Sequence, residues 1–212
     1  MERLDRGRAG GPVSAVVDLH RDADAGAPNE HTVQGLGALL HHEVGRRLHH
    51  RGVVALAAAD PVIGVDGCGI PVHGMPLRAH ATMYARMSVT AEDHPALLRV
   101  LDAMQAEPYL VGGRERDDTA VMEAAPDLVM KEGAEALDCV LVRSEGIGVA
   151  VKIHDGGYRA AGPATIEALN QLGLLTPGAR RRLRSAWRPT LRGGDRPAAT
   201  ITPIFQLSRE QT

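Results

Sequence analysis

The segment LDCVLVRSEGIGVAVKI, residues 137–153, decides the fold of this chain. It holds two runs rich in apolar and β-branched residues, Leu137 to Val142 and Ile147 to Ile153, with four residues between them. A connection of this length suits an antiparallel hairpin. Leu128 to Lys131 is a third run of the same kind, just before the pair. The sequence therefore predicts an antiparallel sheet built around this hairpin.

Helical patterns lie before and after the predicted sheet. Apolar residues recur there at intervals of three or four, and capping residues or prolines mark the ends. The first predicted helix covers Leu77 to Ser88. The second is capped by Thr90 with Asp93, runs through Met104 and ends by Pro108. Three more are predicted, from Asp117 or Asp118 to Ala125, from Pro163 to Leu172 and from Thr176 to Trp187. Short strands are predicted at Val62 to Val65 and Ala199 to Phe205. These elements predict the α+β class, with an antiparallel sheet flanked by helices.

The chain changes in character near residue 31. Residues 1–30 are rich in Arg, Gly, Ala, Asp and Pro and hold one short apolar patch, so we interpret them as a disordered tail. Residues 31–212 are predicted to form one domain. Its first helix, Val33 to Leu48, carries two histidine pairs, His41 with His42 and His49 with His50. A metal site there is conceivable, although a solvated helix face explains the same residues.

Composition limits the kinds of partner that this protein can have. The formal net charge is -2 and only 2% of the residues are aromatic, so neither the charge nor the stacking surface of a nucleic-acid-binding protein is expected. No apolar run reaches the roughly 18 residues that span a bilayer, and the first residues are charged where a secretion signal would be apolar. We therefore expect a cytoplasmic protein that binds a small molecule, with no nucleic-acid or membrane partner.

Two lysines stand out in a chain that otherwise uses arginine for positive charge. They are Lys131 and Lys152, the only lysines of the sequence. An ammonium can lose its proton when it is desolvated and a guanidinium cannot, so such a lysine is a candidate for chemistry. Lys131 stands where a strand pattern breaks and is the better candidate, whereas Lys152 fits the polar position of a strand. Two surface charges left by codon bias would give the same pattern.

The tetrapeptide Asp66-Gly67-Cys68-Gly69 is the second candidate for chemistry. Its glycines let the backbone turn sharply after a strand, which places a carboxylate and a thiol at a strand end, where binding sites gather. An ordinary Asp-Gly turn with a packed cysteine explains the same residues. Cys68 and Cys139 are the only cysteines, too few for a disulfide framework.

Six segments of the chain carry a pattern that extends beyond single residues. In order they are GVDGCGIP (64–71), PLRA (76–79), PYLVGG (108–113), DTAVM (118–122), VMKEGAEA (129–136) and VAVKIHDG (149–156). Together they resemble consecutive blocks of the L-asparaginase II family, most strongly over residues 64–173. The resemblance implies a fold similar to that of serine β-lactamases. It also implies hydrolysis of L-asparagine to L-aspartate and ammonia.

The resemblance implies roles for three residues. Asp66 would contact the substrate, Cys68 would be a thiol site able to hold zinc, and Lys131 would be the catalytic lysine. L-Asparagine is the implied partner, no cofactor is required, and a homodimer is left open. We expect the three side chains to lie within about 15 Å of one another, the distance over which one ligand and its surroundings can join them.

The chain departs from the family pattern upstream of Asp66. Segments of the forms S-x-x-K and C-S-G-K-H are expected there, and this sequence has neither. No serine stands three residues before Lys131 or Lys152. We therefore expect a chain truncated or frame-shifted at its N-terminus, an incomplete sheet, and poor or no hydrolysis of L-asparagine. The alternative is a non-catalytic remnant or a small-molecule-binding domain.

Overall fold

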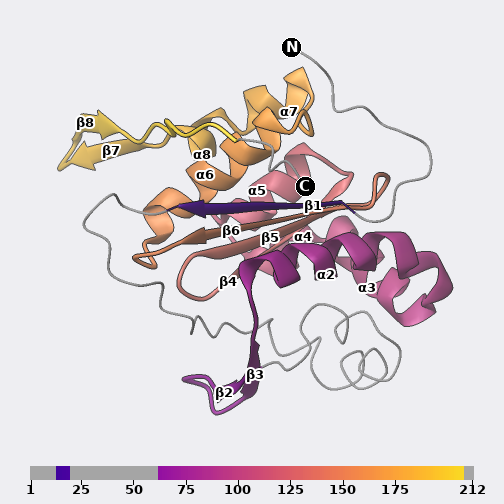
Figure 1. The fold of residues 1–212 in the computed structure, drawn as a ribbon. Coiled ribbons are helices and arrows are strands. Elements are labelled where there is room, and N and C mark those ends of the chain that lie inside the picture. Colours follow the sequence, from indigo (N-terminus) through magenta and orange to yellow (C-terminus); the bar gives the residue numbers. More distant parts are fainter. Residues whose placement is uncertain (1–12, 20–61, 208–212) are drawn as a thin grey trace.

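A four-stranded sheet forms the centre of the computed structural model, which describes residues 13–19 and 62–207 (Figure 1). The strand order is β1-β6-β5-β4. The strands are β1 Val13–Leu19, β4 Leu128–Gly133, β5 Leu137–Val142 and β6 Ile147–Ile153. Strands β4, β5 and β6 are antiparallel neighbours, and β1 runs parallel to β6. The predicted hairpin is therefore confirmed with its predicted bounds.

Strand β1 differs from the predicted disordered tail over residues 1–30, because Val13–Leu19 pairs along β6 from Ile147 to Ile153. An apolar, β-branched run suits a sheet edge. The rest of the predicted tail lies outside the described residues. So do the predicted helix from Val33 to Leu48 and its paired histidines.

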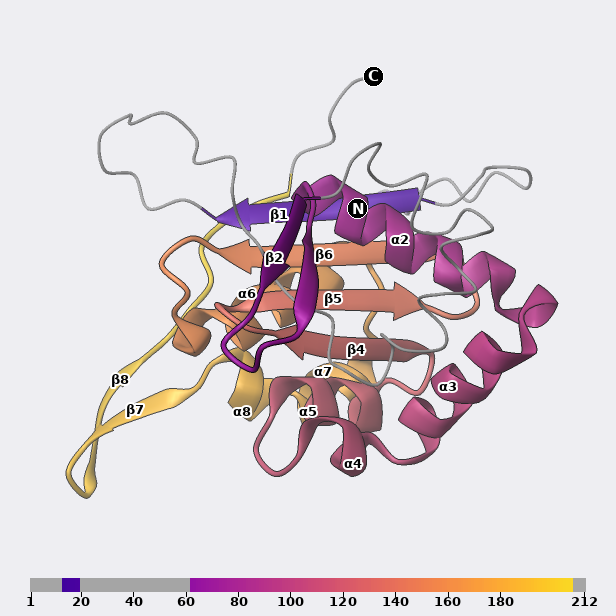
Figure 2. The same cartoon turned by 90° about the horizontal axis from the view of Figure 1, so that it is seen from below.

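Helices cover both faces of the sheet (Figures 1 and 2). One face carries α2 Leu77–Thr90, followed by the short 3-10 helix Ala91–Asp93 and by α3 Pro95–Ala106. After α4 Pro108–Gly112, the other face carries α5 Asp117–Ala124, α6 Tyr158–Gln171, α7 Pro177–Arg182 and α8 Arg184–Trp187. The α+β class is confirmed, and the similarity to serine β-lactamases stays a prediction.

Helix α2 packs in direct contact with β6 because residue 148 is a glycine. A Cβ on Gly148 would lie 2.0 Å from the Ala81 carbonyl oxygen and 2.4 Å from the Ala85 nitrogen. A larger residue would push the helix away from the sheet. Most residues of the three antiparallel strands are buried, and β5 is buried along its entire length.

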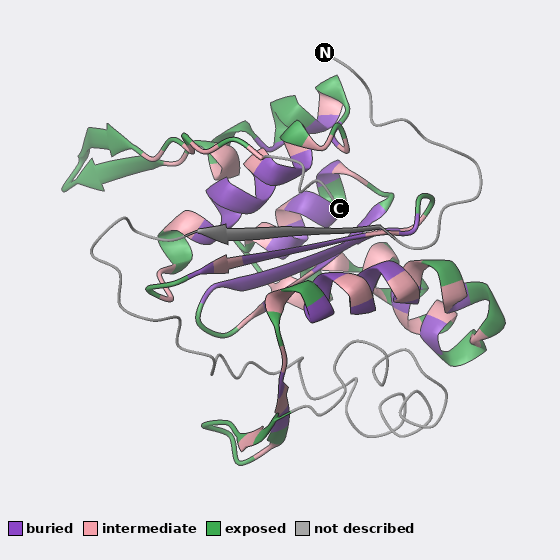
Figure 3. Cartoon of the chain, in the orientation of Figure 1, coloured by how far each residue is buried: buried purple, intermediate pink, exposed green. Residues whose placement is uncertain are grey.

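Two hairpins lie outside the central sheet, and Figure 3 shows most of their residues as exposed, although Val72 and Gly74 of the first hairpin are buried. The first joins β2 Val62–Val65 to β3 Pro71–Gly74 and precedes α2. The second joins β7 Thr190–Gly193 to β8 Arg196–Thr200. The predicted final strand from Ala199 to Phe205 is therefore wrong, because the glycine-rich turn between β7 and β8 forms a hairpin earlier.

Two helix starts also differ from the prediction. Thr90 and Asp93 form no capping box, since Thr90 ends α2 and donates its hydroxyl to the Arg86 carbonyl at 2.9 Å. Helix α6 begins at Tyr158, and Pro163 lies inside it. Among the described residues, no helix is long and apolar enough to cross a membrane.

Candidate functional site

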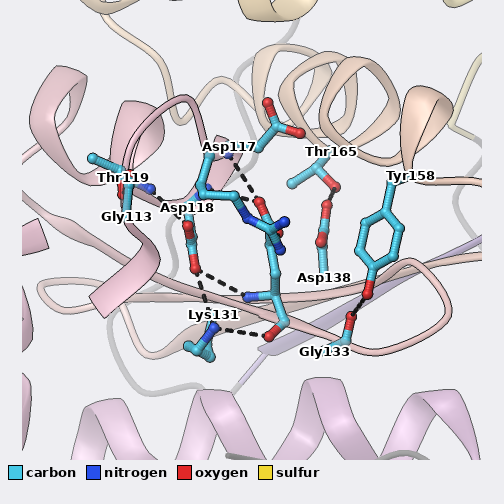
Figure 4. Close-up of polar contacts among 11 residues, drawn as sticks. Gly113, Asp117, Asp118, Thr119, Lys131, Gly133, Asp138, Tyr158 and Thr165 are labelled. Carbon is cyan, nitrogen blue, oxygen red and sulfur yellow. Dashed lines mark hydrogen bonds and ion pairs between the residues drawn. The ribbon is translucent and has the colours of Figure 1, made fainter. Parts of the chain in front are cut away.

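The amine of Lys131 on β4 forms an ion pair with a buried carboxylate (Figure 4). Lys131 Nζ lies 3.3 Å from Asp118 Oδ2 and donates to the Glu132 carbonyl oxygen at 3.0 Å. The Lys131 side chain is 29% exposed, whereas that of Asp118 is 0% exposed. The amine is therefore held by the protein on a side chain that stays partly exposed. Lys152 instead donates to main-chain carbonyl oxygens, as its strand position predicts.

Asp118 is fixed by main-chain donors and by close packing. Its Oδ1 accepts a hydrogen bond from Thr119 N at 2.9 Å, and its Oδ2 accepts one from Glu132 N at 3.5 Å. A Cβ on Gly112 would lie only 2.0 Å from Asp118 Oδ1, so glycine at this position lets the chain close over the carboxylate. A buried charge needs hydrogen bonds and an opposite charge. The ammonium of Lys131 supplies that charge.

Glu132 caps the N-terminus of α5 from the neighbouring strand. Its Oε1 accepts from Asp117 N at 2.9 Å and from Asp118 N at 3.3 Å, and its Oε2 accepts from the Arg116 guanidinium. A negative charge is favourable at this end of a helix. The prediction that Asp117 or Asp118 caps α5 is therefore wrong. The physical reason is that Asp118 turns inward to the amine of Lys131.

Asp138 lies directly opposite Glu132 in the sheet. Like charges in this position repel each other. Asp138 is 1% exposed, and its Oδ2 accepts from Thr165 Oγ1 at 2.7 Å. Its Oδ1 is buried and has no hydrogen-bond partner among the described residues. Burial raises the pKa of the Asp138 carboxyl to about 7; the Thr165 hydrogen bond opposes this rise and the negative charge of Glu132 adds to it.

Asp117 completes the group of four acidic side chains that we name the carboxylate cluster: Asp117, Asp118, Glu132 and Asp138. The carboxylate of Asp117 rests on α6, where a Cβ on Gly162 would lie 2.1 Å from its Oδ2. Burial raises the pKa of Asp117 to about 6, and the charges of Glu132 and Asp118 act in the same direction. The Arg116 guanidinium opposes that rise.

Helix α6 closes the cluster through Tyr158 at its first position (Figure 4). The Arg116 guanidinium carbon lies 5.5 Å from the centre of the Tyr158 ring, a cation–π distance. The Tyr158 hydroxyl donates to the Gly133 carbonyl oxygen at 3.0 Å. These contacts join α5, α6 and the end of β4 around the same group of charges.

Asp66 and Cys68 lie in the turn between β2 and β3, and both are exposed. Asp66 Oδ1 accepts from Cys68 N at 2.8 Å and from Ile70 N at 3.0 Å. The carboxylate thus closes its own turn, which agrees with the ordinary Asp-Gly turn. Among the hydrogen bonds and ion pairs of the described residues, none joins this turn to Lys131. Their shared site therefore stays a prediction.

The described part of the chain does not by itself complete a zinc site at Cys68, which stays a prediction. No group of three or more His, Cys, Asp or Glu residues is placed there to hold a metal ion. Zinc sites use three or four protein ligands. Cys139 offers no second thiol, because it is buried below the sheet surface and burial raises the pKa of its thiol.

Residues 39–203 match the family model of L-asparaginase II. This match covers well over half of the chain. The chain belongs to the L-asparaginase II family. A comparison with curated proteins found no match.

Three of the asparaginase II segments meet at the ion pair. Gly112 comes from PYLVGG, Asp118 from DTAVM and Lys131 from VMKEGAEA. The contact of Gly112 with Asp118 and the ion pair of Asp118 with Lys131 join all three. These three of the six segments therefore share one structural centre.

Most of the carboxylate cluster is not predicted from the sequence of this asparaginase II chain. The sequence pattern indicates helix caps at Asp117 and Asp118 and gives no role to Glu132 or Asp138. One signal was present, since Asp138 follows Leu137 in an apolar run, and a charged residue in a buried strand needs a partner. Nothing in the sequence pattern names that partner.

Proposed function

We propose that this chain is an L-asparaginase-like amidohydrolase, which converts L-asparagine and water to L-aspartate and ammonia. Membership of the L-asparaginase II family carries the proposal. The ion pair of Lys131 supports the position of the site, because a partly exposed ammonium is held there by a buried carboxylate. Lys131 is the proposed catalytic residue, and Asp66 is the proposed substrate-binding residue.

The proposed chemistry of Lys131 depends on its positive charge. L-Asparagine carries an α-carboxylate, and amide hydrolysis passes through a tetrahedral intermediate with a negatively charged oxygen. An ammonium N–H group stabilises either anion. The Asp66 carboxylate is the proposed partner of the substrate α-ammonium. Turnover by these 212 residues is expected to be slow, because they hold no serine in S-x-x-K spacing.

Ammonia release from L-asparagine tests this proposal. The protein is purified from a host that lacks asparaginases, and L-aspartate is measured in the same samples. We expect slow release that Lys131→Ala abolishes and that Lys152→Ala, the matched control at the only other lysine, leaves in place. Circular dichroism verifies that both variants fold. Release that survives Lys131→Ala would exclude the proposed site.

The second candidate function is binding of a small amino acid without turnover. The observation in its favour is that no serine stands three residues before either lysine. Calorimetry with L-asparagine and L-aspartate separates the two functions. Heat of binding with no ammonia release supports the second candidate. A folded protein that gives neither heat of binding nor ammonia would reject both candidate functions.

The remaining expectations concern the state of the protein in solution. We propose a cytoplasmic protein with no required cofactor, in which Cys68 is the thiol able to hold zinc. Elemental analysis of the purified protein tests for zinc. Light scattering after size exclusion tests for the homodimer.

A further inference from the structure

The Lys131 amine is held by two acceptors that belong to different elements. One is Asp118 Oδ2 on α5 at 3.3 Å, and the other is the Glu132 carbonyl oxygen on β4 at 3.0 Å. An ammonium has three N–H donors and no acceptor. Within the described residues, two of the three donors are used. No acceptor for the third donor lies among the residues that the structure describes.

Asp118 is built as a rigid support for that amine. It is wholly buried, its oxygens accept from Thr119 N and Glu132 N, and Gly112 packs against it without a side chain. Thr119 joins the start of α5 to the end of α4, because its hydroxyl donates to the Gly113 carbonyl oxygen at 2.9 Å. The carboxylate therefore has little freedom to follow a moving lysine. The lysine must instead adopt the place that the carboxylate fixes.

We infer that Asp118 is the positioning residue of the site, which holds the Lys131 amine as a hydrogen-bond donor toward an anionic group of the substrate. The group in question is a carboxylate of an amino-acid amide or the oxyanion formed from its amide. The inference rests on the proposed role of Lys131, but its test measures the amine and needs no turnover.

The two lysines of the chain make a direct test possible. An acylating reagent reacts with the lysine amine, so the labelling rate reports how firmly neighbouring groups hold each amine away from the reagent. Mass spectrometry of peptides gives the labelling of Lys131 relative to Lys152 in the same sample. Asp118→Asn removes the opposite charge and keeps the side-chain shape. Asp117→Asn is the matched control, because it neutralises the adjacent residue of the same helix, which makes no bond to Lys131.

We expect Asp118→Asn to raise the ratio of Lys131 to Lys152 labelling severalfold, because the amine loses the carboxylate that holds it. The control should leave the ratio within about twofold of the parent value, since it removes only a more distant charge. A ratio in folded Asp118→Asn that equals the parent ratio would overturn the inference. A purely structural role of Asp118 would alter stability without this selective change.

The parent chain decides the question if Asp118→Asn fails to fold. In protein labelled with 15N at lysine, the Lys131 ammonium signal is the one that Lys131→Arg removes. Hydrogen bonds slow the exchange of ammonium protons with water, so the signal should be visible near neutral pH. Loss of this signal to water exchange in the folded parent would overturn the inference. The ammonia assay is independent, so a chain without turnover can still confirm the position of the amine.

Discussion

Replacing Asp138 by asparagine should stabilise the protein at high pH and have little effect at low pH. The carboxyl is 1% exposed, one of its oxygens has no hydrogen-bond partner in the described part of the chain, and Glu132 stands opposite it. Asparagine has nearly the shape of the protonated acid and can still accept the hydrogen bond from Thr165. It therefore removes a charge that the folded state resists.

The magnitude follows from the pKa of Asp138 in the folded and unfolded states. Burial raises this pKa from 3.8 to about 7. Below pH 4 both states hold the proton, and between pH 4 and pH 7 only the folded state does. Stability therefore falls as pH rises through this window, by up to about 4 kcal/mol in total. Asparagine does not titrate. The difference in free energy of unfolding between Asp138→Asn and the parent should therefore grow by about 2 to 4 kcal/mol from pH 4 to pH 8, in favour of the variant.

Urea unfolding of both proteins at a series of pH values provides the measurement. Asp102→Asn is the control, because Asp102 is 56% exposed in a surface ion pair with Arg143. The free energy of unfolding of Asp102→Asn should stay within about 1 kcal/mol of the parent value at every pH of the series. An Asp138→Asn advantage that does not change with pH would refute the reasoning. So would a variant that is less stable than the parent at pH 8.

Close packing and helix capping give two more tests by urea unfolding. Gly148→Ala should cost about 1–3 kcal/mol, because its new methyl group would meet the Ala81 carbonyl oxygen at 2.0 Å. The control is Gly67→Ala, where a Cβ has nothing within 4 Å, and it should change the free energy of unfolding by no more than about 0.5 kcal/mol. Equal losses in the two glycine variants would contradict the close contact at Gly148. Thr176→Ala should lower the free energy of unfolding by about 1 kcal/mol, because it removes the side chain that accepts from Ala179 N. Thr176→Ser keeps that hydroxyl, so an equal loss in Thr176→Ser would contradict the capping role.

The sequence predicted those parts of the fold that local patterns determine. The hairpin of β5 and β6 has its predicted bounds because strand alternation and a short turn specify it within 17 residues. The cap at Thr176 is confirmed for the same reason, since its acceptor and donor lie three residues apart. Strand β1 was not predicted as part of the sheet. Its partner β6 lies more than 100 residues away, and parallel pairing leaves no turn signal in the sequence.

The candidate site was predictable only in part. The scarcity of lysine singled out Lys131, and the structure gives that residue a buried counter-charge. Asp118 was interpreted as a helix cap because an acidic residue at a helix start usually has that function. Glu132 takes the capping role from a neighbouring strand, which frees Asp118 to face the amine. Such an exchange of roles depends on contacts between elements, and no spacing along the chain reveals it.

The carboxylate cluster combines two halves with different energetics. Asp138 carries a raised pKa and a buried oxygen without a partner, so its charge opposes folding at neutral pH. Asp118 and Glu132 have main-chain donors and opposite charges, so their burial is compensated. Only the compensated half contacts Lys131. Asp138→Asn should therefore change the pH dependence of stability and leave Lys131 labelling unaltered, whereas Asp118→Asn should change that labelling at every pH at which the protein is folded.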